Sequence, residues 1–217
     1  MPSSVTFAPI QAAWARDGWT VCEKPEYAFI VHPFSGEAAG VAVKGSIDRI
    51  DAKPGAGFRI IDYKSWDKIS SARSHVFAGG ARQLEFAAAL GLPAVDGAGR
   101  TPKRIVSVQL PLYAACLAAS AAKYASAPVD LCYLVLGAGE AGVYGGGGAT
   151  GLQLADFAGA AMETAERAAA AIAKGLFWPP GPGGEWERDF KHLFAAGPFK
   201  DVPPGTPWRD AMEGALR

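Results

Sequence analysis

Three charged residues near the middle of the chain have the types and the spacing of a hydrolytic metal site. Asp48 ends the stretch VAVKGSID (41–48), and Asp62 and Lys64 lie near the end of the stretch GFRIIDYKS (57–65). Mg²⁺ prefers oxygen ligands and commonly rests on one or two carboxylates plus substrate phosphates. A neighbouring ammonium can orient a water molecule and offset negative charge that develops on phosphorus. The three residues together therefore predict phosphodiester hydrolysis.

Two strands joined by a short turn must position these side chains. Residues 41–48 alternate apolar and polar side chains, which is typical of a half-buried strand and puts Asp48 on its polar face. Residues 53–57, KPGAG, are rich in turn-forming residues and predict a hairpin. On the strand over 57–65, the face that carries Asp62 is apolar at its start and charged at its end. This change indicates a strand that begins in the core and ends in a cleft.

Spacing alone leaves a second interpretation of the three charged residues open. Asp-x-Lys sequences often form ordinary ion pairs on a protein surface, and such pairs contribute little to stability. A surface cluster of Asp48, Asp62 and Lys64 would need no ligand and would perform no chemistry. A further signal is needed to choose between the two interpretations.

The rest of the chain alternates helices and strands around this hairpin. Pro111 predicts either an irregular helix or a helix that begins close to it. Residues 65–103 predict an insertion that caps the cleft. The expected elements are a short helix over 8–17, a strand over 19–34, a helix over 81–91, a turn-rich segment over 92–103, a helix over 104–124, a buried strand over 129–137, a helix over 152–177 and an irregular tail over 178–217. The last helix is expected to bury Leu154, Phe157, Ala161, Ala165, Ala168, Ile172 and Leu176.

Composition narrows the class of protein. The chain has 217 residues, is 50% hydrophobic and only 19% charged, and is expected to form a single domain over residues 1–217. It has 21 basic and 21 acidic residues, which argues against a protein that coats nucleic acid by bulk charge, although a local basic groove stays open. The N-terminus lacks the features of a signal peptide, and no apolar run is long enough to span a membrane, so a cytoplasmic protein without membrane contact is expected.

The cysteines and one glycine motif predict no further chemistry. Cys22, Cys116 and Cys132 are odd in number and far apart, so we expect buried thiols without a disulfide or a metal clip. Residues 137–142, GAGEAG, match the dinucleotide-binding string G-x-G-x-x-G. The following residues, VYGGGGATG, do not begin a helix, as that motif requires, and a flexible glycine loop is the favoured interpretation.

Three segments in sequence order resemble a known nuclease family. GSIDRID (45–51), IIDYKS (60–65) and QLPLY (109–113) are similar to the pattern of the PD-(D/E)xK nuclease domain of the RecB and AddB type. Each segment alone is a weak signal, but their combination in this order is specific. The resemblance covers roughly residues 19–195.

The resemblance implies an α/β fold with a restriction-endonuclease-like core, in which helices flank a central mixed β-sheet. It also implies cleavage of DNA with Mg²⁺ as cofactor, for which Mn²⁺ can substitute. Carried over by position, the implied roles are metal ligation by Asp48, Asp62 and the main-chain carbonyl of Tyr63, catalysis by Lys64, and support of the site and contact with the DNA strand by Gln109 and Tyr113. Glu23 matches the upstream glutamate of the family, although Glu26 competes for that position.

Two departures from the family pattern matter. Relatives usually place a metal-binding histidine on a helix before the first strand, but no histidine precedes Trp19; His32, His75 and His192 lie elsewhere. The result would be a weaker metal site, an inactive domain, or a chain that is a fragment. Many relatives also hold an iron–sulfur cluster through cysteines near the C-terminus. Glu185, Arg188 and Phe194 occupy those positions here, so no cluster is expected and the aromatic residues Trp186, Phe190 and Phe194 are expected to pack the tail onto the domain.

We therefore expect a metal-dependent DNA nuclease of the recombination and repair type, most simply an exonuclease, which acts with a helicase subunit or within a larger parent chain. The competing class is a nuclease-like domain that binds DNA or a helicase partner with little or no cleavage. Retention of Asp48, Asp62 and Lys64 together favours the enzyme, because a domain that only binds has no need of all three. An unrelated structural domain with a fortuitous Asp-x-Lys is the third interpretation.

Overall fold

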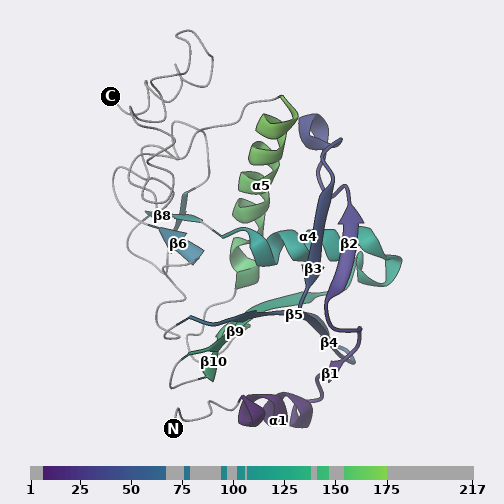
Figure 1. Cartoon of the computed structure of the whole chain (residues 1–217), viewed down its shortest axis with the longest axis vertical. Helices are drawn as coiled ribbons and strands as arrows, with labels where there is room; N and C mark the ends of the chain where they lie inside the picture. The colour runs from purple at the N-terminus through teal and green to yellow at the C-terminus, as the bar shows by residue number, and fades with distance from the viewer. Residues whose placement is uncertain are drawn as a thin grey trace, which may run out of the picture.

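A mixed five-stranded sheet forms the centre of the structure (Figure 1). The computed structural model describes residues 7–66, 76–78, 94–96, 102–105, 107–137, 141–146 and 154–174. The sheet has the order β1-β4-β5-β9-β10, in which β5 and β9 are parallel and the other neighbours antiparallel. Its strands are β1 (Thr20–Val21), β4 (Arg49–Lys53), β5 (Gly57–Lys64), β9 (Val129–Leu136) and β10 (Ala141–Gly145). The expected mixed sheet flanked by helices is confirmed.

The hairpin of β4 and β5 is the element that delivers two of the candidate site residues. Lys53 pairs with Gly57 across the predicted turn, so a hairpin turn at KPGAG is confirmed. The strand predicted over 41–48 was expected to form this hairpin, but Val43–Ile47 pairs with Tyr27–Val31 in a separate sheet, and Arg49–Lys53 is the strand that pairs with β5. Gly57 has φ of +99°. The next residue, Phe58, donates a hydrogen bond from its N–H to the carbonyl oxygen of Pro128 at 2.9 Å. β5 then runs in parallel beside β9 as far as Lys64.

Helices cover both faces of this sheet. α4 (Gln109–Ser120) packs on the face that carries Ile60, and α1 (Ala8–Arg16) packs on the face that carries Ile61. In Figure 1, α1 lies on one side of the sheet and α4 on the other. Ile60 and Ile61 are both buried because β5 is covered on both faces. The predicted alternation along this strand is confirmed.

A two-stranded ribbon projects from the sheet beside α4. It consists of β2 (Tyr27–Val31) and β3 (Val43–Ile47), and Phe29 on its inner face packs edge-on against Tyr113, with ring centroids 5.8 Å apart. β3 leads directly into β4 through Asp48. Ile47 and Ile50, on either side of this junction, pack in the same core although strict alternation would put them on opposite faces. The strand therefore changes its facing at Asp48, which was not predicted.

The segment before α4 differs from the expectation. Residues 102–105 form strand β8 (Pro102–Ile105), so the helix expected from residue 104 begins only at Gln109. Pro111 explains the later start, because proline lacks an N–H and fits only in the first turn of a helix. β8 joins β6 (Phe77–Ala78) and β7 (Ala94–Asp96) in a small sheet, although Ala94–Asp96 was expected to be a turn. The helix expected over 81–91 and the rest of the capping insertion lie outside the described residues.

The C-terminal half confirms the buried strand and corrects details of the last helix. β10 pairs antiparallel with β9, so β9 is followed by a strand and not by the helix that a dinucleotide-binding motif requires. After the turn η4 (Leu154–Phe157), α5 (Ala158–Ala173) buries Ala161, Ala165, Ala169 and Ala171. Ala168 and Ile172 were expected to be buried but are exposed, Ile172 by 53%. All four buried residues of this helix are alanines, and alanine is common on both buried and exposed faces. The sequence therefore did not show which side of the helix packs against the core.

A few remaining expectations can be placed. Cys116 and Cys132 are buried as expected, but Cys22 is exposed. In the described part of the chain, no helix combines the length and apolar character needed to cross a bilayer. The short turns are η1 (Gly36–Ala38) and η3 (Ala122–Tyr124). The tail over 178–217, with Trp186, Phe190 and the positions Glu185, Arg188 and Phe194, lies outside the described residues.

Gly57 provides a test of how β5 is set in the sheet. A Cβ on Gly57 would lie 2.2 Å from the Pro128 carbonyl oxygen, and the residue also holds φ of +99°. We expect Gly57→Ala to lower the free energy of unfolding by about 2–4 kcal/mol, because steric overlap adds to left-handed strain. Gly55→Ala is the matched control: Gly55 also has positive φ, but nothing lies within 4 Å of its added Cβ, so a loss of about 1 kcal/mol is expected. Urea denaturation of the two variants measures both values, and equal losses would contradict the close approach at Pro128.

Candidate active site

Asp62 and Lys64 lie at the end of the central strand and point to the same side of the sheet. They are two residues apart on β5, so their side chains share a face. Asp62 is only 3% exposed, because β5 is paired on both edges and covered on both faces. The Nζ atom of Lys64 lies 2.6 Å from Oδ2 of Asp62. The face predicted to change from apolar to charged therefore ends in a buried carboxylate with an ammonium beside it.

The first residue of α4 connects these two side chains. Nε2 of Gln109 donates hydrogen bonds to Oδ1 of Asp62 at 2.8 Å and to the hydroxyl of Tyr113 at 3.1 Å. Oε1 of Gln109 accepts a hydrogen bond from Nζ of Lys64 at 2.9 Å. Gln109 and Tyr113 are one helical turn apart, and Tyr113 is itself packed against the ribbon. The start of α4 thus orients both the carboxylate and the ammonium.

Asp48 reaches the same place from the junction of the ribbon and the sheet. Extending the register of β4 and β5 by one residue beyond Arg49 and Ile61 puts Asp48 opposite Asp62. Oδ2 of Asp48 accepts a hydrogen bond from the backbone N–H of Tyr63 at 2.8 Å. Asp48 is half-buried, and the main chain of Tyr63 lies against its carboxylate. The structure therefore brings together Asp48, Asp62, Tyr63, Lys64, Gln109 and Tyr113.

The two carboxylates create an electrostatic demand for a cation. Burial raises the pKa of the Asp62 carboxyl, Lys64 opposes that shift, and the negative charge of Asp48 raises the pKa further. Oδ2 of Asp62 is buried and lies 2.6 Å from the Lys64 ammonium, which compensates one negative charge. The charge of Asp48 is not balanced by that pair, and a buried charge is unfavourable unless an ion or a hydrogen bond compensates it.

The donor set fits a hard divalent cation. In the described residues, no three side chains of histidine, cysteine, aspartate or glutamate form a ready-made metal cage. Mg²⁺ does not require such a cage, because it keeps several waters and uses one or two carboxylates plus phosphate oxygens. The carboxylates of Asp48 and Asp62 and the main chain of Tyr63 provide that kind of set.

Other sequence candidates lie elsewhere. Glu23 is engaged by Lys123 and the hydroxyl of Tyr124. Tyr124 packs on Phe58, with ring centroids 4.7 Å apart, and Phe58 precedes Asp62 by four strand residues, or about 13 Å. The structure therefore does not bring Glu23 to the two aspartates.

Glu26, the competing position, lies closer to the site. Its N–H donates to the carbonyl of Asp48 at 3.2 Å, and its carboxylate accepts a hydrogen bond from Ser46 at 3.0 Å. His32 is exposed just after β2, whereas His75 and His192 lie outside the described residues. Of the two upstream glutamates, Glu26 is thus the one beside Asp48, and its carboxylate is committed to Ser46.

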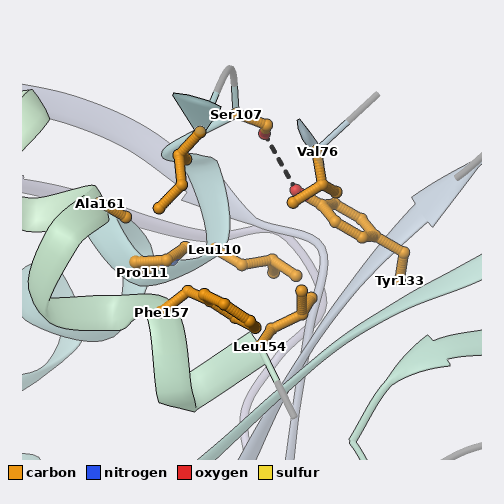
Figure 2. A pocket seen from close by; sticks show the side chains of 9 residues that line it. Val76, Ser107, Leu110, Pro111, Tyr133, Leu154, Phe157 and Ala161 are labelled. Atoms are coloured by element: carbon orange, nitrogen blue, oxygen red, sulfur yellow. Dashed lines mark hydrogen bonds between the residues drawn. The ribbon is translucent and has the colours of Figure 1, made fainter. Parts of the chain in front are cut away.

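Sequence analysis did not identify Tyr133, which lies under Lys64. Tyr133 pairs with Asp62 in the parallel register of β5 and β9, and Nζ of Lys64 lies over its ring, 5.5 Å from the centroid. Its hydroxyl is 3.1 Å from Oγ of Ser107, as Figure 2 shows, and its ring packs against Trp66 with a centroid distance of 5.1 Å. The run LCYLVL indicates a buried strand, but nothing in it reveals which residue of β5 each position meets.

Asp51, the second aspartate of the segment DRID (48–51), does not lie with Asp48 in the candidate site. Asp51 is 0% exposed and is held by two hydrogen bonds from Arg49, at 2.7 and 2.8 Å. Arg49 also lies over the ring of Trp14 from α1, on the opposite face of the sheet from α4. Asp51 therefore has a structural role, and only Asp48 lies with Asp62.

Comparison with known proteins agrees with this geometry. A family model described as the PD-(D/E)XK nuclease superfamily matches residues 7–185, which include every residue of the candidate site. Comparisons with curated proteins and with solved structures found no match. The mixed sheet flanked by helices is consistent with the restriction-endonuclease-like core of that superfamily. The chain belongs to the PD-(D/E)XK nuclease superfamily.

Proposed function

We propose that this chain is a Mg²⁺-dependent deoxyribonuclease of the RecB and AddB type, a single-domain exonuclease that works in recombination and repair in the cytoplasm. The superfamily supports nuclease activity on DNA. One observation carries the proposal: the carboxylate of Asp48, held by the N–H of Tyr63, acts electrostatically on the buried carboxylate of Asp62, which is paired with Lys64. The order of GSIDRID, IIDYKS and QLPLY supports the finer assignment to the RecB and AddB type.

In this proposal the carboxylates of Asp48 and Asp62 and the carbonyl of Tyr63 hold the cation. A bound Mg²⁺ would supply Lewis-acid stabilisation of the scissile phosphate and a more acidic water. The N–H of Tyr63 fixes the carboxylate of Asp48, and Gln109 fixes that of Asp62. Both ligands are thus oriented before substrate arrives, which reduces the reorganisation needed for catalysis.

Lys64 serves as the cationic group beside the reacting phosphate. Its ammonium is held by Asp62 and Gln109, and the Lys64 side chain as a whole is one-quarter exposed. It can therefore donate a hydrogen bond to a water molecule or a phosphate oxygen that enters from solvent. Its charge offsets the negative charge that develops on phosphorus.

A helicase subunit or a larger parent chain is the proposed partner. With 21 basic and 21 acidic residues, the chain has no net charge with which to attract DNA over long distances. A motor that feeds a strand into the site would raise the local DNA concentration without any additional contact by the nuclease. The balanced charge thus favours substrate delivery by a partner.

Removal of either carboxylate tests the metal site. Asp48→Asn and Asp62→Asn should each lower Mg²⁺-dependent cleavage of end-labelled DNA by about three orders of magnitude or more, because a charge that holds the cation is lost. Mn²⁺ binding, measured by calorimetry, should weaken in parallel. Asp130→Asn is the matched control, since Asp130 pairs with Arg59 away from the site and an amide can still accept that hydrogen bond. Cleavage retained by either site variant would refute the assignment.

Lys64 should matter for turnover and not for folding. With saturating Mg²⁺ present, so that Asp62 keeps a compensating cation, we expect Lys64→Met to lower kcat by about 10²–10³-fold while the melting temperature and DNA affinity stay nearly unchanged, because the ammonium then acts chiefly on the transition state. Lys53→Met is the control, since Lys53 pairs with Asp17 at the surface. Single-turnover cleavage, thermal unfolding and DNA binding by anisotropy give the three measurements. A parallel loss of folding and activity would identify Lys64 as part of a structural ion pair instead.

The raised pKa of Asp62 predicts how metal binding depends on pH. A carboxyl whose pKa is higher in the folded protein favours folding when it is protonated, and this contribution is lost as pH rises through the folded-state pKa. A cation needs the ionised form, so protons and Mg²⁺ compete at Asp62. The increase in melting temperature caused by saturating Mg²⁺ should therefore grow with pH across the range in which Asp62 ionises. Asp62→Asn should remove both the Mg²⁺ effect and its pH dependence; a Mg²⁺ effect that persists in this variant would place the metal elsewhere.

A further inference from the structure

We propose that Tyr133 is a positioning residue that holds the ammonium of Lys64 in its reactive place. The role in catalysis rests on the proposed nuclease function, whereas the contact itself does not. Nζ of Lys64 lies over the Tyr133 ring at 5.5 Å from the centroid, within the range in which an aromatic face attracts a cation. No motif in the sequence marks this tyrosine, because it comes from a different strand, β9.

Lys64 needs such a contact because its other partners have competing tasks. A lysine ammonium sits on a flexible stem of four carbons and does not hold its own position. Asp62 is shared between Lys64 and the proposed cation, so its hold on the ammonium weakens when it turns its charge to a metal. Gln109 presents one oxygen to Lys64 while its amide nitrogen is divided between Asp62 and Tyr113. The ring face competes with neither the metal nor the water.

Tyr133 can act as a fixed surface because its own ring is immobilised. It is 2% exposed, its hydroxyl is hydrogen-bonded to Ser107, and Trp66 packs against its ring. The space beside it is a cavity of about 10 Å³, room for about one water molecule, with Leu110 among its lining residues (Figure 2). The ring therefore has little room to tilt away, and the parallel register that pairs Tyr133 with Asp62 sets its height on the sheet.

The test separates the ring from the hydroxyl in the full 217-residue chain. Tyr133→Phe keeps the ring and should keep kcat within about twofold of the unaltered protein. Tyr133→Leu removes the ring and should lower kcat by about tenfold, with KM nearly unchanged, as expected for loss of a partly desolvated cation–π contact. In the Lys64→Met background the same Tyr133→Leu change should have no further effect on kcat, because Tyr133 acts through Lys64.

A matched control distinguishes loss of the cation–π contact from the general effect of a cavity in the core. Tyr144 lies opposite Tyr133 on β10, is also buried, and is two strands away from Lys64. Tyr144→Leu should lower the melting temperature about as much as Tyr133→Leu but leave kcat within about twofold. If Tyr133→Leu does not fold, Tyr133→Met fills a similar volume without a ring and replaces it in every comparison.

A second readout does not depend on catalysis. In the metal-free protein, the rate at which acetic anhydride acetylates the Lys64 amine, with acetate as the leaving group, is followed by mass spectrometry and reports how firmly the ammonium is held. The rate should be the same in the unaltered protein and Tyr133→Phe, and about threefold or more higher in Tyr133→Leu but not in Tyr144→Leu. If this pattern appears and the unaltered protein does not cleave DNA, the contact stands and the nuclease function falls. Equal kcat and equal labelling in the Phe and Leu variants would overturn the proposal for Tyr133 while leaving the nuclease function intact.

Discussion

The burial of one ionised carboxylate governs the arrangement of the site. Asp62 occupies the last part of a strand that is paired on both edges and covered on both faces, so its charge has little access to water. Two neighbours compensate that charge in part, since Gln109 donates one hydrogen bond and Lys64 provides a positive charge. Asp48 opposes them, because its negative charge repels that of Asp62. A charge held away from water next to a like charge is a cost to the fold that is common at catalytic sites.

The same sheet treats charge differently on its two faces. On the α1 face, Asp51 and Arg49 satisfy each other in a closed pair, and Arg59 stacks on Trp19 at 4.0 Å while bound to Asp130. Each of those carboxylates has its own guanidinium. On the α4 face, Asp62 pairs with Lys64, whereas Asp48 accepts a hydrogen bond from the N–H of Tyr63 and has no ion-pair partner among those found in the described residues. The pairs on the α1 face are therefore close to electrostatic balance, whereas Asp48 and Asp62 together exceed the charge of Lys64 at the place where a metal is proposed.

Much of this arrangement follows from local sequence patterns. The alternation of β5, the turn that precedes it and the long apolar run of β9 are all signals within one element, and the turn and both strands are present where they were expected. The proximity of Gln109 and Tyr113 follows from the helical repeat alone. What local patterns do not contain is the pairing between elements. The parallel register that puts Tyr133 beside Asp62 and under Lys64 depends on how β9 is set by the loop at Pro128, and no periodicity records that choice. The exposed Ile172 and the strand at Ala94–Asp96 were misjudged for a related reason, since tertiary packing decided them against the local preference.

In the segment SIDRID, strict alternation of side chains predicts which face each residue lies on only as far as Asp48. Strict alternation from Ile47 onward would send Ile50 to the face opposite Ile47, yet both residues lie in one core. The facing of the strand must therefore change between them, and Asp48 lies at the change, where β3 leaves the ribbon and β4 enters the sheet. Irregularities of this kind are frequent beside active sites because they re-aim a side chain. Here the change leaves Asp51 paired on the α1 face and brings Asp48 to the N–H of Tyr63. Because the strand changes its side-chain orientation once, at Asp48, the two aspartates lie on different faces of the sheet. Asp48 lies in the candidate site, and Asp51 forms a structural ion pair.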